Sequence, residues 1–228
     1  MRRERSTSSS RRRSTSAVAR CFRAFASGMG LCGDSTGERC GCQVWATEAI
    51  LHDVPKELDL ARYIRDVPDF PQPGILFRDI TPLLQDGGAL KAVIDRFTEY
   101  YRHVRLDAVV SIESRGFLFG APLAYNLGLP LVPVRKPGKL PAAKMSVEYE
   151  LEYGSNTLDI HSDALAKGDS VVIIDDLLAT GGTAMAAAKL VEMLGANVHS
   201  FAFLIELGFL KGREALEGYE VLALLRYE

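Results

Sequence analysis

The segment Val171–Thr183, VVIIDDLLATGGT, constrains the fold of this chain more than any other stretch. Its β-branched start is typical of a strand buried on both faces, and the acidic pair Asp175 and Asp176 follows. Glycines that turn N–H groups inward, hydroxyl donors and the positive N-terminus of a following helix together form a phosphate-binding loop. The residues predicted to form this loop are Ala179, Thr180, Gly181, Gly182 and Thr183.

Two carboxylates beside a phosphate site indicate a sugar phosphate rather than a bare phosphate. Carboxylates repel a phosphate but accept hydrogen bonds from the neighbouring hydroxyls of a sugar. We therefore expect the sugar hydroxyls to bind Asp175 and Asp176, and the phosphate to bind the loop. The loop is not a Walker loop, because no Lys follows the glycines. The alternative is a tight strand–helix turn with capping threonines and solvent-facing aspartates.

The hydrophobic pattern predicts an α/β fold with a doubly wound, mostly parallel sheet, because strands alternate with helices. A hairpin is expected from strands at 147–151 and 157–160 around Tyr153 and Gly154. The other expected strands cover residues 108–112, 131–134, 170–174, 198–205 and 220–225. The expected helices cover 58–65, 89–101, 116–127 and 182–194.

Charge is unevenly distributed along the 228 residues. The whole chain has 27 basic and 29 acidic residues, and residues 1–30 hold eight Arg and one acid. This leaves 19 basic and 28 acidic residues, a balance of −9, in residues 31–228. We expect no nucleic-acid partner, because such proteins need basic charge for phosphate contacts. No apolar run reaches the roughly 20 residues of a membrane-spanning helix, so a soluble protein without a membrane partner is expected.

The first 45 residues differ in composition from the rest and are predicted to be a leader and linker, either disordered or a targeting segment. The Arg- and Ser-rich composition of residues 1–30 is typical of an organelle transit peptide, and a disordered basic tail is the alternative. All four cysteines lie here, and free thiols are favoured over a metal site because the spacing of Cys40 and Cys42 is not that of a zinc ribbon. Residues 28–33 match the G-x-G-x-x-G pattern of dinucleotide-binding proteins. No strand is predicted before this match and no helix after it, so we reject it as a dinucleotide-binding site. Residues 46–228 are predicted to form the globular domain.

VVIIDDLLATGGT resembles the phosphoribosyl-pyrophosphate (PRPP) motif of the type I phosphoribosyltransferases. The resemblance to the adenine-specific branch of this family extends over most of residues 58–228. It is carried by the segments PDFPQPGILFRDITPLL (68–84), ESRGFLFGAPLA (113–124), RKPGKLP (135–141), YELEYG (149–154) and ELGFLKGRE (206–214). It implies the family's fold, with a small base-binding hood and a flexible lid.

The resemblance implies a transferase that converts adenine and PRPP to AMP and pyrophosphate, a purine-salvage reaction. Two alternatives stay open from the residues themselves. One is a family member that acts on another base, and the other is a non-catalytic regulator that senses PRPP or purines. The acidic balance and the absence of a helix-turn-helix pattern argue against a regulator that binds nucleic acid.

Two basic segments are candidates for anion binding, and the resemblance implies that the anion at Arg115 is pyrophosphate. Arg115 follows a strand and opens a helix, where its guanidinium and nearby amides suit an anion. A surface ion pair with Glu113 is the alternative. Residues 135–139 supply Arg135, Lys136 and Lys139 at the end of another strand. We interpret them as a pyrophosphate clamp at the base of a mobile lid, residues 138–150, that excludes water.

The remaining site residues are implied by the resemblance. It assigns the proton of the attacking base to Glu152, with Tyr153 closing beside the substrate, and an exposed strand acid is the alternative for Glu152. It assigns adenine binding to Leu76, Arg78 and Leu207. Phe77 can stack on the base, although core packing would also explain it.

The expected cofactor is Mg²⁺, which would arrive with PRPP. It is held through substrate and water near Asp175 and Asp176, because the sequence has no dedicated metal cage. The expected substrates are adenine and PRPP. The resemblance also implies a homodimer and a cytoplasmic location, with a plastid or mitochondrion as the alternative if residues 1–45 are a transit peptide.

Overall fold

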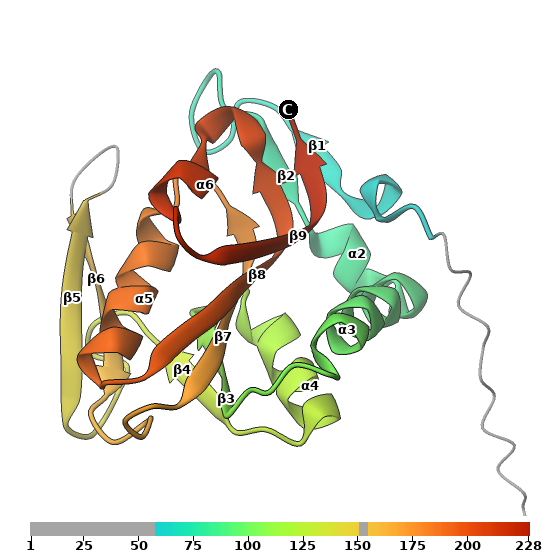
Figure 1. Cartoon of the computed structure of the whole chain (residues 1–228). Coiled ribbons are helices and arrows are strands. Elements are labelled where there is room, and N and C mark those ends of the chain that lie inside the picture. The colour runs from blue at the N-terminus through green and yellow to red at the C-terminus, as the bar shows by residue number, and fades with distance from the viewer. Residues whose placement is uncertain (1–57, 151–154) are drawn as a thin grey trace, which may run out of the picture. The chain divides into compact units, whose positions relative to one another are not determined.

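The fold is organised around one parallel sheet, which Figure 1 shows edge-on between its helices. A computed structural model describes residues 58–150 and 155–228. The strands are hydrogen-bonded in the order β4-β3-β7-β8-β9, and every neighbouring pair is parallel. They are β3 (Ala108–Ile112), β4 (Leu131–Val134), β7 (Ser170–Leu178), β8 (Asn197–Leu207) and β9 (Glu220–Tyr227). The predicted α/β class and parallel sheet are confirmed.

Helices cover both faces of this sheet. Helices α3 (Gly87–Tyr101) and α4 (Phe117–Leu127) pack on one face, and α5 (Gly182–Met193) packs on the other. Successive strand residues point to opposite faces, so Val172 joins the apolar cluster under α3 and α4 while Ile173 joins the cluster under α5. The central strand is therefore buried on both sides, as its β-branched sequence predicts.

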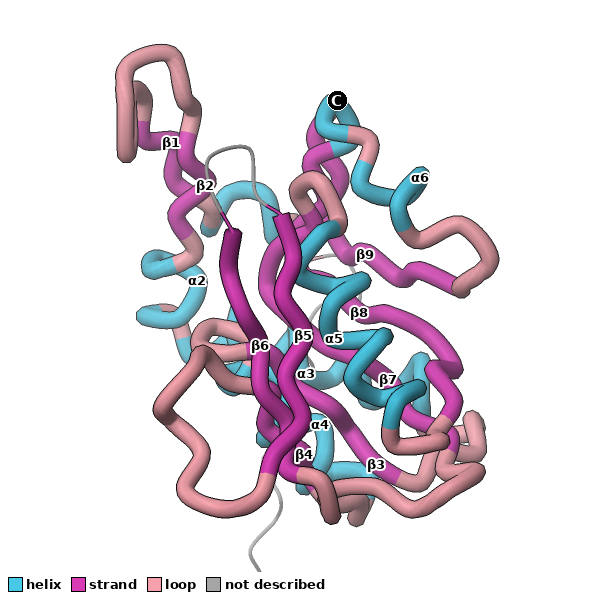
Figure 2. Tube along the Cα trace, turned by 90° about the vertical axis from the view of Figure 1, so that its left-hand side faces the viewer, coloured by secondary structure: helices cyan, strands magenta, loops and turns pink. Residues whose placement is uncertain are grey.

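A β-hairpin lies outside α5, as Figures 1 and 2 both show. Its strands, β5 (Lys144–Glu150) and β6 (Ser155–His161), are antiparallel with Tyr149 opposite Asn156. The predicted lid, residues 138–150, is thus a loop followed by a strand. Whether it moves stays a prediction.

Small elements flank the carboxyl edge of the sheet. A short antiparallel pair, β1 (Arg65–Val67) and β2 (Phe77–Asp79), follows the 3-10 helix η1 (Leu60–Tyr63) and encloses a loop rich in Pro and Gly. After β8 come η2 (Gly208–Leu210) and the four-residue helix α6 (Gly212–Ala215).

The N-terminal end of the described domain departs from the sequence pattern in two places. The expected helix over 58–65 is shorter because Arg65 already belongs to β1, where its Nη2 lies 2.8 Å from Oδ2 of Asp79. Helix α2 (Thr81–Gln85) is not predicted by the pattern. Pro82 lies in its first turn, where a missing N–H leaves no hydrogen bond unmade.

Strand β7 also runs further than predicted. We expect its end at Ile174, with the two aspartates beyond it, but it continues to Leu178. Strand β8 stays paired alongside, with Asp175 opposite Phe203 and Leu178 opposite Glu206. Pairing with a long neighbour therefore outweighs the low strand preference of Asp.

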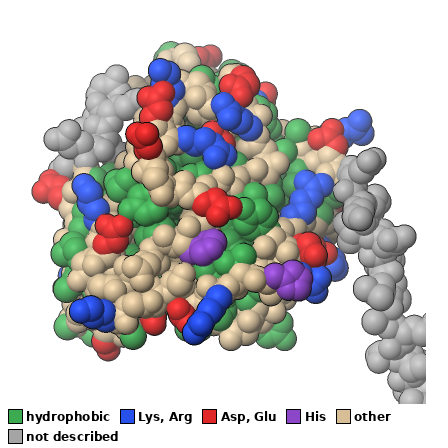
Figure 3. Space-filling view, in the orientation of Figure 1, with side chains coloured by type: hydrophobic (Ala, Val, Ile, Leu, Met, Phe, Trp, Pro, Cys, Tyr) green, Lys and Arg blue, Asp and Glu red, His purple; other side chains and the backbone are tan. Residues whose placement is uncertain are grey.

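Charges of both signs are mixed on the face of the described residues that Figure 3 presents. None of the described helices is long and apolar enough to cross a bilayer. The predicted leader and the boundary at 45/46 lie outside the described residues.

Candidate active site

The phosphate loop, Ala179–Thr183, joins β7 to α5. Gly181 precedes the helix with φ +88°, a left-handed conformation that favours glycine. Among the described residues no side chain caps α5, so the N–H groups of its first turn have no protein acceptor there. These groups and the helix dipole point positive charge at the space beyond β7, as the sequence predicts.

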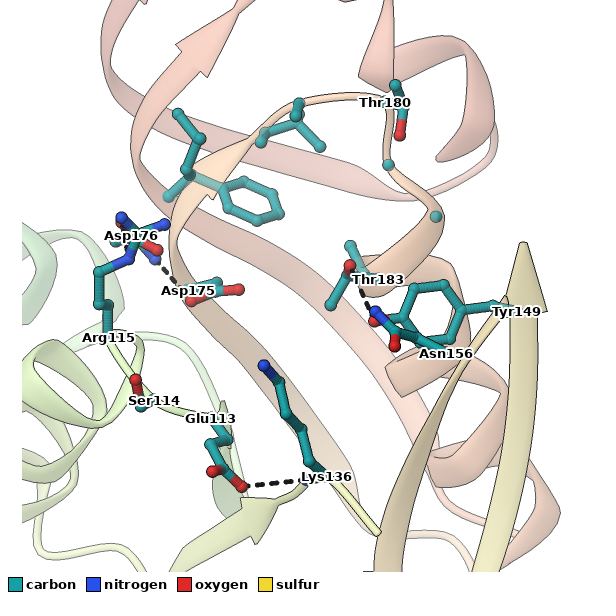
Figure 4. Close-up of a pocket in the computed structure, with 17 residues that line it drawn as sticks. Glu113, Ser114, Arg115, Lys136, Tyr149, Asn156, Asp175, Asp176, Thr180 and Thr183 are labelled. Atoms are coloured by element: carbon teal, nitrogen blue, oxygen red, sulfur yellow. Dashed lines mark hydrogen bonds and ion pairs between the residues drawn. The ribbon is translucent and has the colours of Figure 1, made fainter. Parts of the chain in front are cut away.

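The two aspartates lie at the mouth of this loop, near the end of β7. The backbone N–H of Asp176 donates to Oδ1 of Asp175 at 2.9 Å, and Asp176 itself is buried. Nε of Arg115 lies 2.9 Å from Oδ2 of Asp176 (Figure 4). The predicted alternative for Arg115, a surface pair with Glu113, is therefore not what the structure has.

The surroundings of both aspartates raise the pKa of their carboxyl groups. Burial, together with the adjacent charge of Asp176, raises the pKa of Asp175 well above its ordinary value. Burial also raises the pKa of Asp176, although the Arg115 guanidinium opposes that shift. Perturbed carboxyls that line a cavity are typical of a functional site.

The turn between β3 and α4 brings Arg115 to the same edge. A side chain at Gly116 would lie 2.6 Å from the carbonyl oxygen of Ile112 and 2.8 Å from that of Ile174. Only glycine lets this turn lie directly on β7. Gly116 therefore allows the turn Ser114–Gly116 to pack closely against β7.

Glu113, at the start of that turn, holds the neighbouring basic segment. Its Oε2 accepts from Nε of Arg135 at 3.1 Å and from the backbone N–H of Lys136 at 3.0 Å. Partial burial acts against ionisation, but these hydrogen bonds lower the pKa of Glu113. The carboxylate therefore fixes the direction in which Lys136 leaves the sheet.

The three predicted clamp cations have different environments. Lys136 lines the cavity, and its side chain extends into the space between Asp175 and Thr183 in Figure 4. Arg135 pairs with Glu113 and donates to the carbonyl oxygen of Lys139 at 3.3 Å. Of these three described residues, only Lys136 lines the cavity.

The cavity itself has a volume of about 290 Å³. It brings together the aspartates, the phosphate loop, Arg115 and Lys136, as predicted. Sequence reasoning missed Tyr149 and Asn156, cross-strand partners on the hairpin; the hydroxyl of Thr183 donates to that of Tyr149 at 3.3 Å. The lining residues are Glu113, Ser114, Arg115, Lys136, Tyr149, Asn156, Asp175, Asp176, Leu177, Leu178, Ala179, Thr180, Gly181, Gly182, Thr183, Ala184 and Phe203.

The predicted base-binding residues, Leu76, Phe77, Arg78 and Leu207, are not among the described residues that line this cavity. The Phe77 ring is 5.7 Å from the guanidinium carbon of Arg115, which connects β2 to the aspartate pair. Phe77 also packs edge-on against Phe70, with ring centroids 5.2 Å apart, so part of its surface serves packing. Leu76 is exposed.

Arg78 and Leu207 meet through the C-terminal strand. The guanidinium of Arg78 lies 3.9 Å above the Tyr227 ring and pairs with Asp66. Leu207 is buried opposite Tyr227 in the β8–β9 ladder. Thus both residues belong to one side of the molecule, and the side chain of Arg78 is held by protein partners.

Glu152 and Tyr153 lie outside the described residues. The described residues contain no cluster of three or more His, Cys, Asp or Glu side chains that could hold a metal ion. They do place two carboxylates at a polar cavity, and oxygen ligands suit Mg²⁺. This donor set fits an ion held mainly by substrate and water.

Comparison with known proteins identifies relatives. Residues 81–217 match the model of the phosphoribosyl transferase domain family. The adenine phosphoribosyltransferase of Roseiflexus sp. (strain RS-1) is 60% identical over 169 residues, which cover 74% of this chain and 98% of the relative.

Solved structures agree with that assignment. Adenine phosphoribosyltransferase from Thermoanaerobacter pseudethanolicus has 54% identity and a TM-score of 0.72, covering 74% of this chain and 98% of its own. The Saccharomyces cerevisiae enzyme, solved with D-2,5-dideoxy-2,5-imino-altritol 1,6-bisphosphate and adenine, has 45% identity and a TM-score of 0.69. That match covers 73% of this chain and 96% of the yeast chain.

Proposed function

The chain belongs to the adenine phosphoribosyltransferase family, and from that membership we propose that it converts adenine and PRPP to AMP and pyrophosphate. The supporting observation is one cavity with three kinds of group: a carboxylate pair, the uncapped N-terminus of α5, and the cations of Arg115 and Lys136. A sugar that carries a phosphate at one end and a diphosphate at the other matches these groups in order.

The cavity supports a distinct role for each group. The 5′-phosphate binds the N–H groups and hydroxyls of the phosphate loop. The ribose hydroxyls donate to Asp175 and Asp176. The diphosphate lies toward Lys136 and the turn around Arg115, where opposite charge stabilises the leaving group.

The reaction exchanges one bond at the anomeric carbon for another. The bond from that carbon to the pyrophosphate oxygen breaks, and a bond to a ring nitrogen of adenine forms, through an oxocarbenium-like sugar. The proton on the attacking nitrogen must leave, and the family resemblance assigns it to Glu152, with Tyr153 beside it. Both roles are carried over by sequence position.

Mg²⁺ fits the same cavity. Asp175 and Asp176 would hold the ion through water while substrate oxygens supply the other ligands, and the ion supplies charge neutralisation at the diphosphate when bound. Arg115 and Lys136 add positive charge there, so the chain shares this task with the ion.

Adenine as the acceptor is supported by the segment at β2 and by the relatives' names. Purified protein incubated with PRPP, Mg²⁺ and equal concentrations of adenine, hypoxanthine, guanine, xanthine and orotate should yield AMP as the main nucleotide in mass spectrometry. Another main nucleotide would reassign the acceptor, and no nucleotide from folded protein would reject the proposal.

A homodimer is proposed on the family resemblance, and the surface of α4 offers support. Leu118 and Tyr125 are apolar or aromatic and exposed on this helix, Tyr125 by 86%. Light scattering after gel filtration should give twice the 25.0 kDa mass of the chain, and a monomer at micromolar concentration would reject it.

The location is proposed to be cytoplasmic, as the resemblance implies, with an organelle as the alternative if residues 1–45 are removed on import. Sequencing the N-terminus of the native protein distinguishes the two. A terminus near residue 45 supports import, and an intact Met1 supports the cytoplasm.

A further inference from the structure

Helix α6 contacts the outer side of the phosphate loop backbone to backbone. A Cβ at Gly212 would clash with the carbonyl oxygen of Ala179 and lie 2.9 Å from Cδ1 of Leu178. From the other side, a Cβ at Gly181 would lie 2.7 Å from the carbonyl oxygen of Gly212 and 2.8 Å from Cβ of Ala215. Gly212 on α6 and Gly181 in the loop thus allow this close contact, and a side chain at either position would push the two segments apart.

A four-residue helix has little stability of its own, so its position needs an external anchor. Arg213 provides it. Its Nε lies 2.8 and 2.9 Å from the two carboxylate oxygens of Glu206, and its Nη1 donates to the carbonyl oxygen of Val221 at 3.0 Å. A forked guanidinium on a carboxylate fixes orientation as well as distance.

The anchor point is itself part of the rigid sheet. Glu206 lies in β8 directly opposite Leu178, the last residue of β7 before the phosphate loop. Its side chain is only 3% exposed, and a second arginine, Arg226 on β9, lies 3.9 Å away. Helix α6 is therefore tied to the strand that ends beside the loop it contacts.

We propose that α6, held in position by the ion pair of Arg213 and Glu206, supports the phosphate loop from outside and keeps it in its phosphate-binding conformation. The inference rests on the proposed function and deepens it, making Gly212, Arg213 and Glu206 positioning residues. The N–H groups of the loop point at one phosphate only while the loop backbone stays in a fixed position relative to that phosphate. Because the backbone of α6 contacts the backbone of the loop directly, the loop cannot shift by a rearrangement of side chains between them.

Ribose 5-phosphate is the suitable probe, because it carries the sugar and the 5′-phosphate but neither diphosphate nor base. Gly212→Ala should weaken its binding in calorimetry by about tenfold or more, since small misplacements of positioning groups cost this much. The KM for PRPP should rise in parallel while kcat and the KM for adenine at saturating PRPP stay within about threefold.

The matched control is Gly87→Ala. Gly87 begins α3 as Gly212 begins α6, but a Cβ placed there would have no described atom within 4 Å apart from its chain neighbours and the backbone of its own helix. This variant should bind ribose 5-phosphate like the wild type. Equal effects of the two substitutions would point to a general helix effect and overturn the proposal.

A second set of variants separates positioning from stability. Arg213→Ala leaves Glu206 buried without its main partner, so it should lower both the melting temperature and the affinity. Adding Glu206→Gln removes the unpaired charge and should restore the melting temperature without restoring the affinity. Arg213→Lys should give intermediate values of the melting temperature and the affinity, because an ammonium group cannot bind both carboxylate oxygens in the planar geometry of a guanidinium. Arg102→Ala, which breaks an exposed pair with Glu99, should change neither.

Wild-type affinity in the folded double variant Arg213→Ala/Glu206→Gln would overturn the proposal, whether or not Gly212→Ala folds. Failure of the proposed function would look different: wild-type protein would bind ribose 5-phosphate yet form no AMP. A wild type that does not bind ribose 5-phosphate would overturn both.

Discussion

The ionised form of Asp175 costs stability in the folded chain. Burial and the neighbouring carboxylate raise its pKa, so the folded chain holds this proton more tightly than the unfolded chain does. Its contribution to stability is therefore full below the unfolded pKa and is lost as the pH rises through the folded pKa. The ionised side chain therefore costs stability, and the proposed contact with the ribose hydroxyls would offset this cost.

Asp175→Asn should consequently stabilise the protein at neutral pH, by about 1 kcal/mol, while abolishing detectable binding of ribose 5-phosphate. The gain should shrink as the pH falls toward about 4, where the unfolded carboxyl is also protonated. Urea unfolding at several pH values measures it. Asp163→Asn, at an exposed position, should show neither effect, and a destabilised Asp175→Asn variant would contradict this interpretation.

The basic segment after β4 supplies a second prediction at this scale. Lys136 lines the cavity and Lys139 does not, so Lys136→Ala should raise the inhibition constant of pyrophosphate by about tenfold, a typical loss for a charged contact. Lys139→Ala should change it by less than about twofold. Product-inhibition kinetics decide between them, and the reverse order would place the pyrophosphate elsewhere.

At the level of elements, the base of the hairpin depends on one buried acid. Asp159 on β6 is fully buried, pairs with Lys144 and accepts from the hydroxyl of Ser146 at 2.6 Å. Burial opposes ionisation, but the hydrogen bonds of Lys144 and Ser146 lower the pKa of Asp159. Backbone bonds of 2.7 and 2.9 Å also join Asp159 to Arg135, at the root of the basic segment.

Asp159→Asn should therefore destabilise the protein by about 2 kcal/mol at neutral pH, because it leaves Lys144 without its partner. A lowered pKa stabilises the fold above the unfolded pKa, so the difference should fade as the pH drops through the folded pKa. Urea unfolding tests this, with Asp95→Asn as control. Asp95 forms an exposed helix pair with Lys91, which is worth less than about 0.5 kcal/mol. Equal losses would contradict the role of Asp159.

Sequence patterns predict most of the helices and strands, together with the aspartate pair and the phosphate loop. They do so because strands buried on both faces and glycine turns leave strong local patterns. What it misses depends on long-range pairing. The extension of β7 to Leu178 needs β8 alongside, and the approach of Tyr149 to Thr183 needs the hairpin register. Likewise, which of the clustered cations faces the cavity is decided by Glu113, a residue 23 positions before Lys136.

On the scale of the whole molecule, every described residue that lines the cavity lies between Glu113 and Phe203. The match to the Roseiflexus relative covers 98% of that protein with only 74% of this chain. Because none of the proposed site residues lies in residues 1–45, removing this segment should leave kcat/KM for adenine and PRPP within about twofold. Steady-state assays of both forms test this, and a large loss of activity would assign the leader a part in catalysis.

We propose that a phosphoribosyl group is transferred to adenine in the cavity at the end of β7. The most direct measurement is pyrophosphate release on adding adenine to protein, PRPP and Mg²⁺, in the wild type and in the double variant Asp175→Asn/Asp176→Asn. We expect adenine-dependent release with equimolar AMP in the wild type and a loss of at least about a hundredfold in the folded variant. Undiminished release in that variant, or none from the wild type, would contradict it.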